Sequence, residues 1–274
     1  MAVRTATRAE PRAGTFPGAM EYLTWGDGPR TMLFIQGGPG RTIPTGLMRR
    51  ATGRLFAPYV SAGYAVWIVA RRRHMPAGHS IADMADDYAR IIAEQFGGSV
   101  DLVVGESFGG MVAQDLAARH PECVGRVALV VSGYEVSPWG KAVDLRLAEA
   151  LRRGDRLAAG GAFAEYLLPG RALGPVRRLL APLLARAVVD HGPREDMLVE
   201  VEAEVGYDSR GVLDRVRAPV LLICGDRDRF FPPAVVRETA ARIPDCQLVW
   251  YSRAGHMRAA SSSRIARDVL AFAT

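Results

Sequence analysis

The sequence is poor in the features that mark disulfide-rich, metal-binding, secreted or membrane proteins. Its three cysteines (Cys123, Cys224 and Cys246) lie far apart without a Cys-x-x-Cys pair, which argues against a disulfide framework or a zinc site. No stretch approaches the roughly 20 apolar residues that span a bilayer, and residues 1–12 lack the apolar core of a secretory signal. We therefore expect a cytoplasmic protein without a metal site or a membrane partner.

Lysine is almost absent, although the chain is basic. Lys141 is the only lysine, and the formal net charge of +6 reflects arginines scattered along the sequence. Their densest run, Arg71 to Arg73, has no interleaved aromatic residues, so we interpret it as a charged loop, with contact to an anionic substrate as the alternative. Because nucleic-acid binding needs a basic face or a recognised motif, we expect no nucleic-acid partner.

Length and composition allow one large α/β domain. The chain has 274 residues, of which 49% are hydrophobic, enough for a sizeable core. Short apolar runs alternate with helical patterns, and this alternation predicts a mostly parallel sheet covered by helices on both faces. The first two predicted strands flank a turn at residues 26–29 and are expected to form a hairpin. The predicted strands are 20–25, 31–35, 64–69, 100–104, 127–131, 219–224 and 247–251.

A long helical segment interrupts the alternation. Residues 134–207 contain helical patterns at 142–151, 176–189 and 195–205, broken by Gly160-Gly161 and other Gly and Pro residues, and no convincing strand. We interpret this segment as a helical cap inserted into a core formed by residues 15–133 and 208–274. Residues 1–14 are expected to be a flexible N-terminal tail.

The region around Ser107 has the pattern of a nucleophile elbow. An apolar strand ends in Gly105-Glu106-Ser107-Phe108-Gly109, and a helical pattern starts without a linker. A serine in so sharp a turn adopts a strained backbone, and there is little room for a Cβ two residues before or after it, where Gly105 and Gly109 stand. The hydroxyl then lies at a helix N-terminus, which favours a developing anion.

Three further segments follow predicted strands and should meet Ser107 at one edge of the sheet. They are a glycine-rich loop at residues 36–40, the segment with Asp228 and the segment with His256. Reactive groups of an open α/β sheet collect at the carboxyl ends of its strands. Histidine can accept a serine proton, and a carboxylate can orient the imidazole ring. Reserve candidates for the acid are Asp226 and Glu135.

In these motifs the sequence resembles the α/β-hydrolase family, over residues from about 20 to 272. The order Ser107, Asp228, His256 is the family's chain order, and Asp228 keeps the family's spacing to Pro232. The resemblance implies an α/β-hydrolase fold with an inserted cap. It also implies that Ser107 is the nucleophile, His256 the base and Asp228 the acid.

The loop Gln36-Gly37-Gly38-Pro39-Gly40 resembles the family's His-Gly-Gly-Pro-Gly oxyanion loop, with Gln36 in place of the usual histidine. The resemblance implies that the backbone N–H groups of Gly38 and Phe108 hold the oxyanion. The family often has an Asp-x-Arg-Gly stretch after the strand at 64–69. Here residues 70–73 read Ala-Arg-Arg-Arg, so the resemblance implies no role for that loop.

Several other residues have more than one interpretation. The aromatic candidates for substrate binding could equally belong to the core. Candidate substrate-binding residues are Gln36, Trp139, Phe230 and Phe231. Histidines interpreted as solvated or capping are His74, His79, His120 and His191. We interpret the side chains of Glu200, Glu202 and Glu204 as an exposed helix face, with recognition of an amine as the alternative.

The leading hypothesis is a metal-independent serine hydrolase with a small-molecule substrate and no cofactor. Ser107 would form an acyl-enzyme with a small, largely apolar carboxylic ester, thioester or lactone, and water would hydrolyse it. Because a fold does not fix a reaction, three alternatives stay open: a proline-iminopeptidase-like or C–C bond hydrolase, a lyase or cofactor-free oxygenase, and an inert small-molecule binding protein. A homo-oligomer also stays open.

Overall fold

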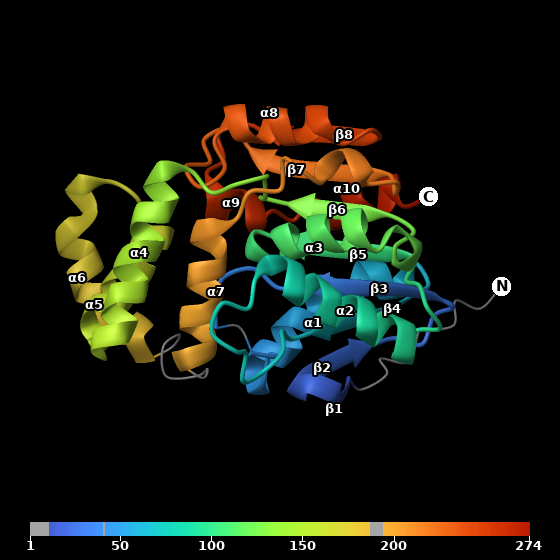
Figure 1. Ribbon diagram of the computed structural model, residues 1–274, viewed down its shortest axis with the longest axis horizontal. Coiled ribbons are helices and arrows are strands. Elements are labelled where there is room, and N and C mark those ends of the chain that lie inside the picture. Colours follow the sequence, from blue (N-terminus) through green and yellow to red (C-terminus); the bar gives the residue numbers. More distant parts are fainter. Residues whose placement is uncertain (1–10, 41, 187–193) are drawn as a thin grey trace.

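A computed structural model describes residues 11–40, 42–186 and 194–274, and its strands form one eight-stranded sheet (Figure 1). The strand order is β1-β2-β4-β3-β5-β6-β7-β8. Strands β3 to β8 run parallel, while β2 is antiparallel to both β1 and β4. The predicted mostly parallel sheet is therefore confirmed. The strands are β1 (Arg12–Phe16), β2 (Met20–Trp25), β3 (Arg30–Ile35), β4 (Tyr64–Val69), β5 (Leu102–Glu106), β6 (Val127–Val130), β7 (Val220–Gly225) and β8 (Cys246–Tyr251).

Helices cover both faces of the sheet because its central strands are apolar on both sides. Successive side chains of a strand point to opposite faces, so Met32 and Leu33 of β3 enter two different core clusters. The cluster with Leu33 contains side chains of α2, α3 and α8, and the cluster with Met32 contains side chains of α1 and α10. The helices of the core are α1 (Gly46–Ser61), α2 (Ile81–Gln95), α3 (Phe108–Arg119), α8 (Pro233–Arg242), α9 (His256–Ala260) and α10 (Ile265–Phe272).

Two predictions about the N-terminal strands were wrong. Residues 12–14, expected in the flexible tail, belong to β1 and pair antiparallel with β2, while residues 1–10 lie outside the described part of the chain. Strands β2 and β3 do not form a hairpin, because β4 lies between them. The apolar strand β3 is covered on both faces, and such a strand takes parallel neighbours, here β4 and β5.

Among the described residues between β6 and β7, four α-helices lie at the position of the expected cap. They are α4 (Pro138–Arg153), α5 (Arg156–Leu167), α6 (Gly174–Leu184) and α7 (Arg194–Gly206). In Figure 1, α4, α5 and α6 stand beside the α/β layers, and α7 runs between them and the sheet. Within residues 134–186 and 194–207 there is no strand, and residues 187–189 of one predicted helix lie outside the description.

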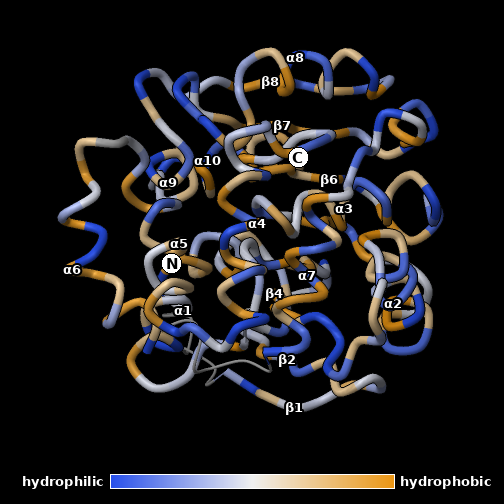
Figure 2. Tube along the Cα trace, turned by 60° about the vertical axis from the view of Figure 1, so that its left-hand side comes forward, coloured by the Kyte–Doolittle hydropathy of each residue, from blue (hydrophilic) through white to orange (hydrophobic). Residues whose placement is uncertain are grey.

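The outer surface of the cap is partly apolar. Exposed side chains on α6 include Val176, Leu179 and Leu183. Figure 2 shows hydrophobic colour along buried strands such as β6, whereas α6 mixes hydrophilic and hydrophobic residues.

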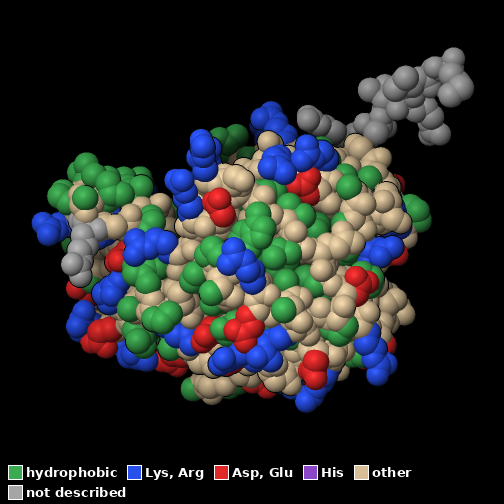
Figure 3. All heavy atoms as spheres, turned by 90° about the horizontal axis from the view of Figure 1, so that it is seen from above, with side chains coloured by type: hydrophobic (Ala, Val, Ile, Leu, Met, Phe, Trp, Pro, Cys, Tyr) green, Lys and Arg blue, Asp and Glu red, His purple; other side chains and the backbone are tan. Residues whose placement is uncertain are grey.

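On the face in Figure 3, Lys and Arg side chains are spread widely and several lie beside Asp or Glu. Of the helices described, none combines the length and the apolar character needed to cross a membrane.

Helix α5 contains the Gly160-Gly161 pair that was expected to interrupt the helical segment. A Cβ on Gly160 would lie 2.1 Å from the carbonyl oxygen of Ala181 in α6, whereas a Cβ on Gly161 would meet no atom within 4 Å. The backbones of α5 and α6 therefore approach closely at Gly160. The prediction of a break was wrong because this packing outweighs the low helix propensity of glycine.

We expect Gly160→Ala to destabilise the protein and Gly161→Ala to stabilise it. The first variant would force α5 and α6 apart, at a cost of about 1–3 kcal/mol for overpacking. The second adds a methyl group in open space and gains up to about 1 kcal/mol of helix propensity. Urea denaturation followed by circular dichroism measures both free energies of unfolding. Equal changes in the two variants would contradict the close packing at Gly160.

Candidate active site

Ser107 occupies a sharp turn between β5 and α3, as the elbow pattern predicts. Its φ of 51° and ψ of −114° lie in a sparsely populated region, so the backbone is strained. A Cβ on Gly105 would lie 2.5 Å from the carbonyl oxygen of Gly109, and a Cβ on Gly109 would lie 2.1 Å from that of Ile35. The predicted lack of room at both glycines is confirmed, and Ser107 stands at the N-terminus of α3.

The glycine-rich loop after β3 packs against this turn. A Cβ on Gly37 would lie 2.8 Å from the carbonyl oxygen of Glu106 and 3.1 Å from Cβ of Ser107, and Gly38 has a φ of 70°. The absence of side chains lets the loop backbone approach the serine. Within the described ranges, the N–H groups of Gly38 and Phe108 donate to no acceptor. Both are therefore available to an oxyanion beside Ser107.

Asp228 lies on the loop after β7 and His256 is the first residue of α9, and the segments that lead to them touch through a glycine. A Cβ on Gly225 would lie 2.2 Å from the carbonyl oxygen of Ala254, so no side chain separates the two backbones. The Asp228 side chain is fully buried, while 13% of the His256 side chain is exposed. The carboxylate is thus shielded from water, and the imidazole keeps an open side.

The three predicted catalytic side chains form a continuous series of hydrogen bonds. Nε2 of His256 lies 3.0 Å from Oγ of Ser107, and Nδ1 lies 2.7 Å from Oδ2 of Asp228. The other carboxylate oxygen accepts hydrogen bonds from the N–H groups of Phe230 and Phe231, at 2.8 and 3.1 Å. Because a carboxylate only accepts, Nδ1 carries the proton and Nε2 can accept the serine proton. This arrangement can activate a hydroxyl as a nucleophile.

The reserve candidates lie outside this series. Asp226 is exposed, and Glu135 forms an ion pair with Lys141 at 3.0 Å. The remaining described histidines are either exposed or bonded to aspartates away from Ser107, and His191 falls outside the described residues. His74 is exposed, His79 bonds Asp87, and His120 bonds Asp86.

The predicted charged loop is wrong at Arg71, which is buried. Nε of Arg71 lies 2.6 Å from Oε1 of Glu200 on α7, and the guanidinium also donates to the carbonyl oxygens of Gln36 and Gly38, at 2.7 and 2.5 Å. Glu200 accepts a further hydrogen bond from the N–H of Gly40. A planar guanidinium can serve several acceptors at once, so Arg71 joins the glycine-rich loop to the cap. No local sequence signal indicates this pairing.

The predicted exposed face of α7 is also wrong, because only Glu202 of the three glutamates is exposed. Burial, and secondly the nearby charge of Asp144, raises the pKa of Glu204 well above its ordinary value. Burial also raises the pKa of Asp144 to about 7. Oδ1 of Asp144 accepts a hydrogen bond from the Tyr166 hydroxyl, while Oδ2 has no partner in the described part of the chain. The cap interior therefore holds two carboxyl groups whose ionised forms are disfavoured by burial.

Aromatic side chains lie between this acidic region and His256. The ring of Phe230 lies 5.0 Å from that of His256, and Tyr166 stacks on Phe230 at 5.0 Å. Trp139 contacts Phe230 edge to face at 5.0 Å, and Phe231 is buried 5.9 Å from the imidazole. Phe230 and Phe231 therefore adjoin His256 but belong to the buried core, which was the alternative interpretation, and Trp139 is partly exposed beside Phe230. Tyr166 was missed because its helix shows no distinctive local pattern.

Oε1 of Gln36 is buried and has no hydrogen-bond partner among the residues described. Among those residues, no three His, Cys, Asp or Glu side chains lie close enough together to hold a metal ion.

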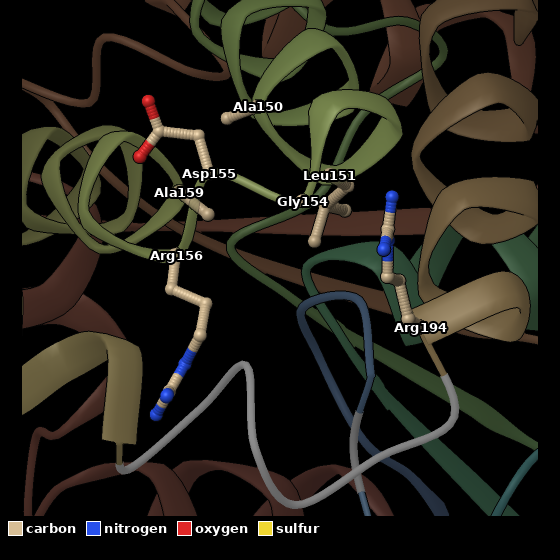
Figure 4. A pocket seen from close by; sticks show the side chains of 7 residues that line it. All are labelled: Ala150, Leu151, Gly154, Asp155, Arg156, Ala159 and Arg194. Carbon is tan, nitrogen blue, oxygen red and sulfur yellow. The ribbon is translucent and has the colours of Figure 1, made fainter.

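The pocket in Figure 4 lies in the cap, where α4, α5 and α7 meet, and no catalytic candidate lines it. Its lining residues are Ala150, Leu151, Gly154, Asp155, Arg156, Ala159 and Arg194.

Comparison with known proteins agrees with this fold. The model of the alpha/beta hydrolase family matches residues 32–267. A RutD protein of Yersinia enterocolitica, whose name assigns it as a carbamate hydrolase, is 27% identical over 203 residues, which cover 72% of this chain and 70% of the relative. The pimeloyl-[acyl-carrier protein] methyl ester esterase of Chromobacterium violaceum is 30% identical over 179 residues, with coverages of 63% and 68%. The crystal structure of the enol-lactonase from Burkholderia xenovorans LB400 shares the fold, with a TM-score of 0.71, 22% identity and coverages of 95% and 99%.

We expect Asp144→Asn to flatten the pH dependence of stability. An unfolded Asp has a pKa of about 3.9, whereas the folded protein raises the pKa of Asp144 to about 7. The folded state therefore holds an extra proton between these values. The contribution of this proton to folding stability is complete below about pH 4 and is lost as the pH rises through about 7. The loss is at most about 4 kcal/mol. Asparagine does not titrate and can still accept the Tyr166 hydrogen bond.

Denaturant unfolding between about pH 5 and about pH 8 measures this difference. Stability of the unchanged protein should decline across the range more steeply than stability of Asp144→Asn. Glu202→Gln, on the exposed side of α7, is the control and should keep the full decline. Parallel curves for the Asp144→Asn variant and the unchanged protein would exclude Asp144 as the source.

Proposed function

The chain belongs to the alpha/beta hydrolase family, and on this premise we propose that it is a serine hydrolase. Its substrate is a small, largely apolar carboxylic ester, thioester or lactone, whose acyl group is carried by Ser107 between two half-reactions. One observation carries the proposal: Ser107 Oγ, His256 and Asp228 follow one another at hydrogen-bond distances of 3.0 and 2.7 Å.

In the first half-reaction, Ser107 Oγ attacks the substrate carbonyl carbon while Nε2 of His256 takes the hydroxyl proton. The imidazolium then donates this proton to the leaving alcohol, thiol or ring oxygen, and the acyl-enzyme remains. In the second half-reaction, water attacks the acyl-enzyme and the same nitrogen takes and returns a proton. Proton transfer by a positioned base contributes roughly 10²- to 10⁴-fold to the rate. Asp228 stabilises the transient imidazolium and holds the required tautomer.

The tetrahedral intermediate carries a negative oxygen, and the N–H groups of Gly38 and Phe108 are proposed to hold it. Each such donor typically contributes about 3 kcal/mol to the transition state. The N-terminal end of α3 adds partial positive charge at the same place. Gln36 is proposed to face the substrate through its side-chain oxygen, which has no hydrogen-bond partner in the part of the chain that the structure describes.

The aromatic side chains beside His256 support an apolar acyl group. Phe230 and Phe231 belong to the core cluster, whereas Trp139 is partly exposed beside Phe230, so substrate carbon atoms placed against Trp139 would be removed from water. Two of the named relatives, the methyl ester esterase and the enol-lactonase, have names that specify cleavage of carboxylic ester bonds. Specificity within this class would depend on the cap.

We expect Ser107→Ala to lose at least about 10⁴-fold of kcat on p-nitrophenyl butyrate, because no other group can carry the acyl chain. Ester turnover followed by absorbance measures the loss, and circular dichroism checks that the variant is folded. A fluorophosphonate should add to Ser107 of the unchanged protein, as read by peptide mass spectrometry. Wild-type turnover by the folded Ser107→Ala variant would remove Ser107 from the mechanism.

Two aspartates of one loop provide a matched control. Asp228→Asn should lower kcat about 10⁴-fold, because the carboxamide favours the wrong imidazole tautomer. Asp226→Asn changes an exposed side chain two residues away and should leave kcat unchanged. A loss of kcat confined to Asp226→Asn would instead assign the role of the acid to Asp226.

A second candidate, hydrolysis of an amine-bearing substrate in the manner of a proline iminopeptidase, is favoured by the two buried carboxyl groups of the cap. Asp144 and Glu204 have raised pKa values, chiefly because they are buried. A substrate ammonium group would supply the missing positive charge and allow both groups to ionise. Tyr166 bonds Asp144 and stacks on Phe230, so the acidic region adjoins the aromatic one.

The two candidates differ in their response to an amine. If the second is correct, proline p-nitroanilide should be a better substrate than p-nitrophenyl butyrate. Asp144→Asn and Glu204→Gln should then raise KM for the proline substrate about 10- to 100-fold, the effect of losing a buried charge pair. Glu202→Gln should leave this KM unchanged. Absence of proline release by the wild-type protein would reject the second candidate and leave the first intact.

A further inference from the structure

We infer that Arg71 is a positioning residue for the oxyanion hole, and that Glu200 makes this positioning depend on helix α7 of the cap. The inference rests on the proposed function, because the hole has a role only if acyl transfer takes place at Ser107. Arg71 does not touch the reacting atoms. It acts through the backbone of residues 36–40.

The glycine-rich loop has little conformational preference of its own. Gly37 and Gly38 are adjacent residues without a Cβ, and Gly38 adopts a positive φ of 70°. A peptide unit between two glycines rotates at low cost, and the N–H of Gly38 belongs to that unit. Contacts from outside the loop must therefore keep this donor directed toward Ser107.

Arg71 supplies such contacts on both sides of the Gly37–Gly38 peptide. Its two terminal nitrogens donate to the carbonyl oxygens of Gln36 and Gly38, at 2.7 and 2.5 Å. With the preceding and following carbonyl groups held, rotation of the intervening peptide would break one of these hydrogen bonds. The guanidinium carbon also lies 4.5 Å from the centre of the Phe108 ring. One side chain therefore contacts both residues that supply the oxyanion donors.

Glu200 connects this arrangement to the cap. One carboxylate oxygen lies 2.6 Å from Nε of Arg71, and the other accepts the N–H of Gly40. The two side chains are 3% and 4% exposed, so water does not compete for these contacts. A displacement of α7 would release Gly40 and remove a partner of Arg71. The cap position and the geometry of the oxyanion hole are thus coupled.

A purely structural ion pair would behave differently. Two buried charges lose hydration that their attraction restores only in part, so apolar replacements of a whole pair are often neutral or stabilising. The positioning role depends instead on the shape of the guanidinium, whose planar donors reach two carbonyls and a carboxylate together. The two roles can therefore be separated by experiment.

Arg71→Lys tests the shape while keeping the charge. An ammonium can pair with Glu200 but cannot hold the two carbonyl groups in the guanidinium geometry. We expect kcat on p-nitrophenyl butyrate to fall about 10- to 100-fold while KM changes less than about threefold, because the hole acts in the transition state. Affinity for an alkyl boronate, which forms a tetrahedral anion on the serine, should fall with kcat. Arg73→Lys, on the same loop but paired with Glu21, is the control and should keep kcat.

The double variant Arg71→Met/Glu200→Met separates positioning from folding stability. Its thermal midpoint should return to within a few degrees of the unchanged protein, because no buried charge is left unpaired. Its kcat should remain lowered about 10²-fold, because the loop has lost its contacts with Arg71 and Glu200. Recovery of both stability and kcat would overturn the positioning role. Unchanged kcat and boronate affinity in Arg71→Lys would overturn it as well, whether or not the double variant folds.

The wild-type protein distinguishes failure of this inference from failure of the proposed function. If it hydrolyses the ester and takes the phosphonate at Ser107, while the Arg71 variants match it, only the positioning role fails. If the wild-type protein neither hydrolyses the ester nor takes the phosphonate, the proposed function fails and the inference with it.

Discussion

The geometry at Ser107 depends on backbone segments that meet too closely for side chains. A Cβ on Gly105 or Gly109 would collide with backbone oxygen atoms 2.5 and 2.1 Å away, and a Cβ on Gly225 would lie 2.2 Å from another. These contacts fix the turn around the serine and hold the loops of the acid and the histidine together. A strained residue costs roughly 1–3 kcal/mol and persists only where its surroundings determine it. Here the surroundings are a core in which Phe108 and the neighbouring strand are almost fully buried.

Buried charged side chains are the second feature of the site, and helix α7 carries two of them, Glu200 and Glu204. Glu200 is balanced by Arg71 and by hydrogen bonds, whereas Glu204 and Asp144 have raised pKa values because burial penalises their ionised forms. Apolar side chains at these positions would avoid that cost. The carboxyl groups beside the aromatic residues near His256 therefore do not lower the free energy of the folded state through their charge.

Local sequence predicted the parts of the fold that local interactions determine. Strand ends, the glycine pattern around Ser107 and the loops of Asp228 and His256 could be read because each depends on a few adjacent residues. The pairing of β2 with β4 could not, because a turn signal does not say which strand inserts between its neighbours. The partnership of Arg71 with Glu200 spans 129 positions, and on sequence alone both appeared to be surface charges. The prediction of a helix break at Gly160 was wrong for the same reason, because the carbonyl oxygen that Gly160 approaches, that of Ala181, lies on α6.

The division between core and cap explains why the sequence predicts the type of reaction better than it predicts the substrate. Ser107, His256 and the proposed oxyanion donors lie on the α/β layers, where strand order determines which loops meet. The acidic and aromatic neighbours of the site come largely from the cap, where helix packing follows no comparable rule. Arg71 and Glu200 cross this division with hydrogen bonds to the loop that borders Ser107. A displacement of α7 would disturb those bonds, so the position of this helix and the geometry of the glycine-rich loop are not independent.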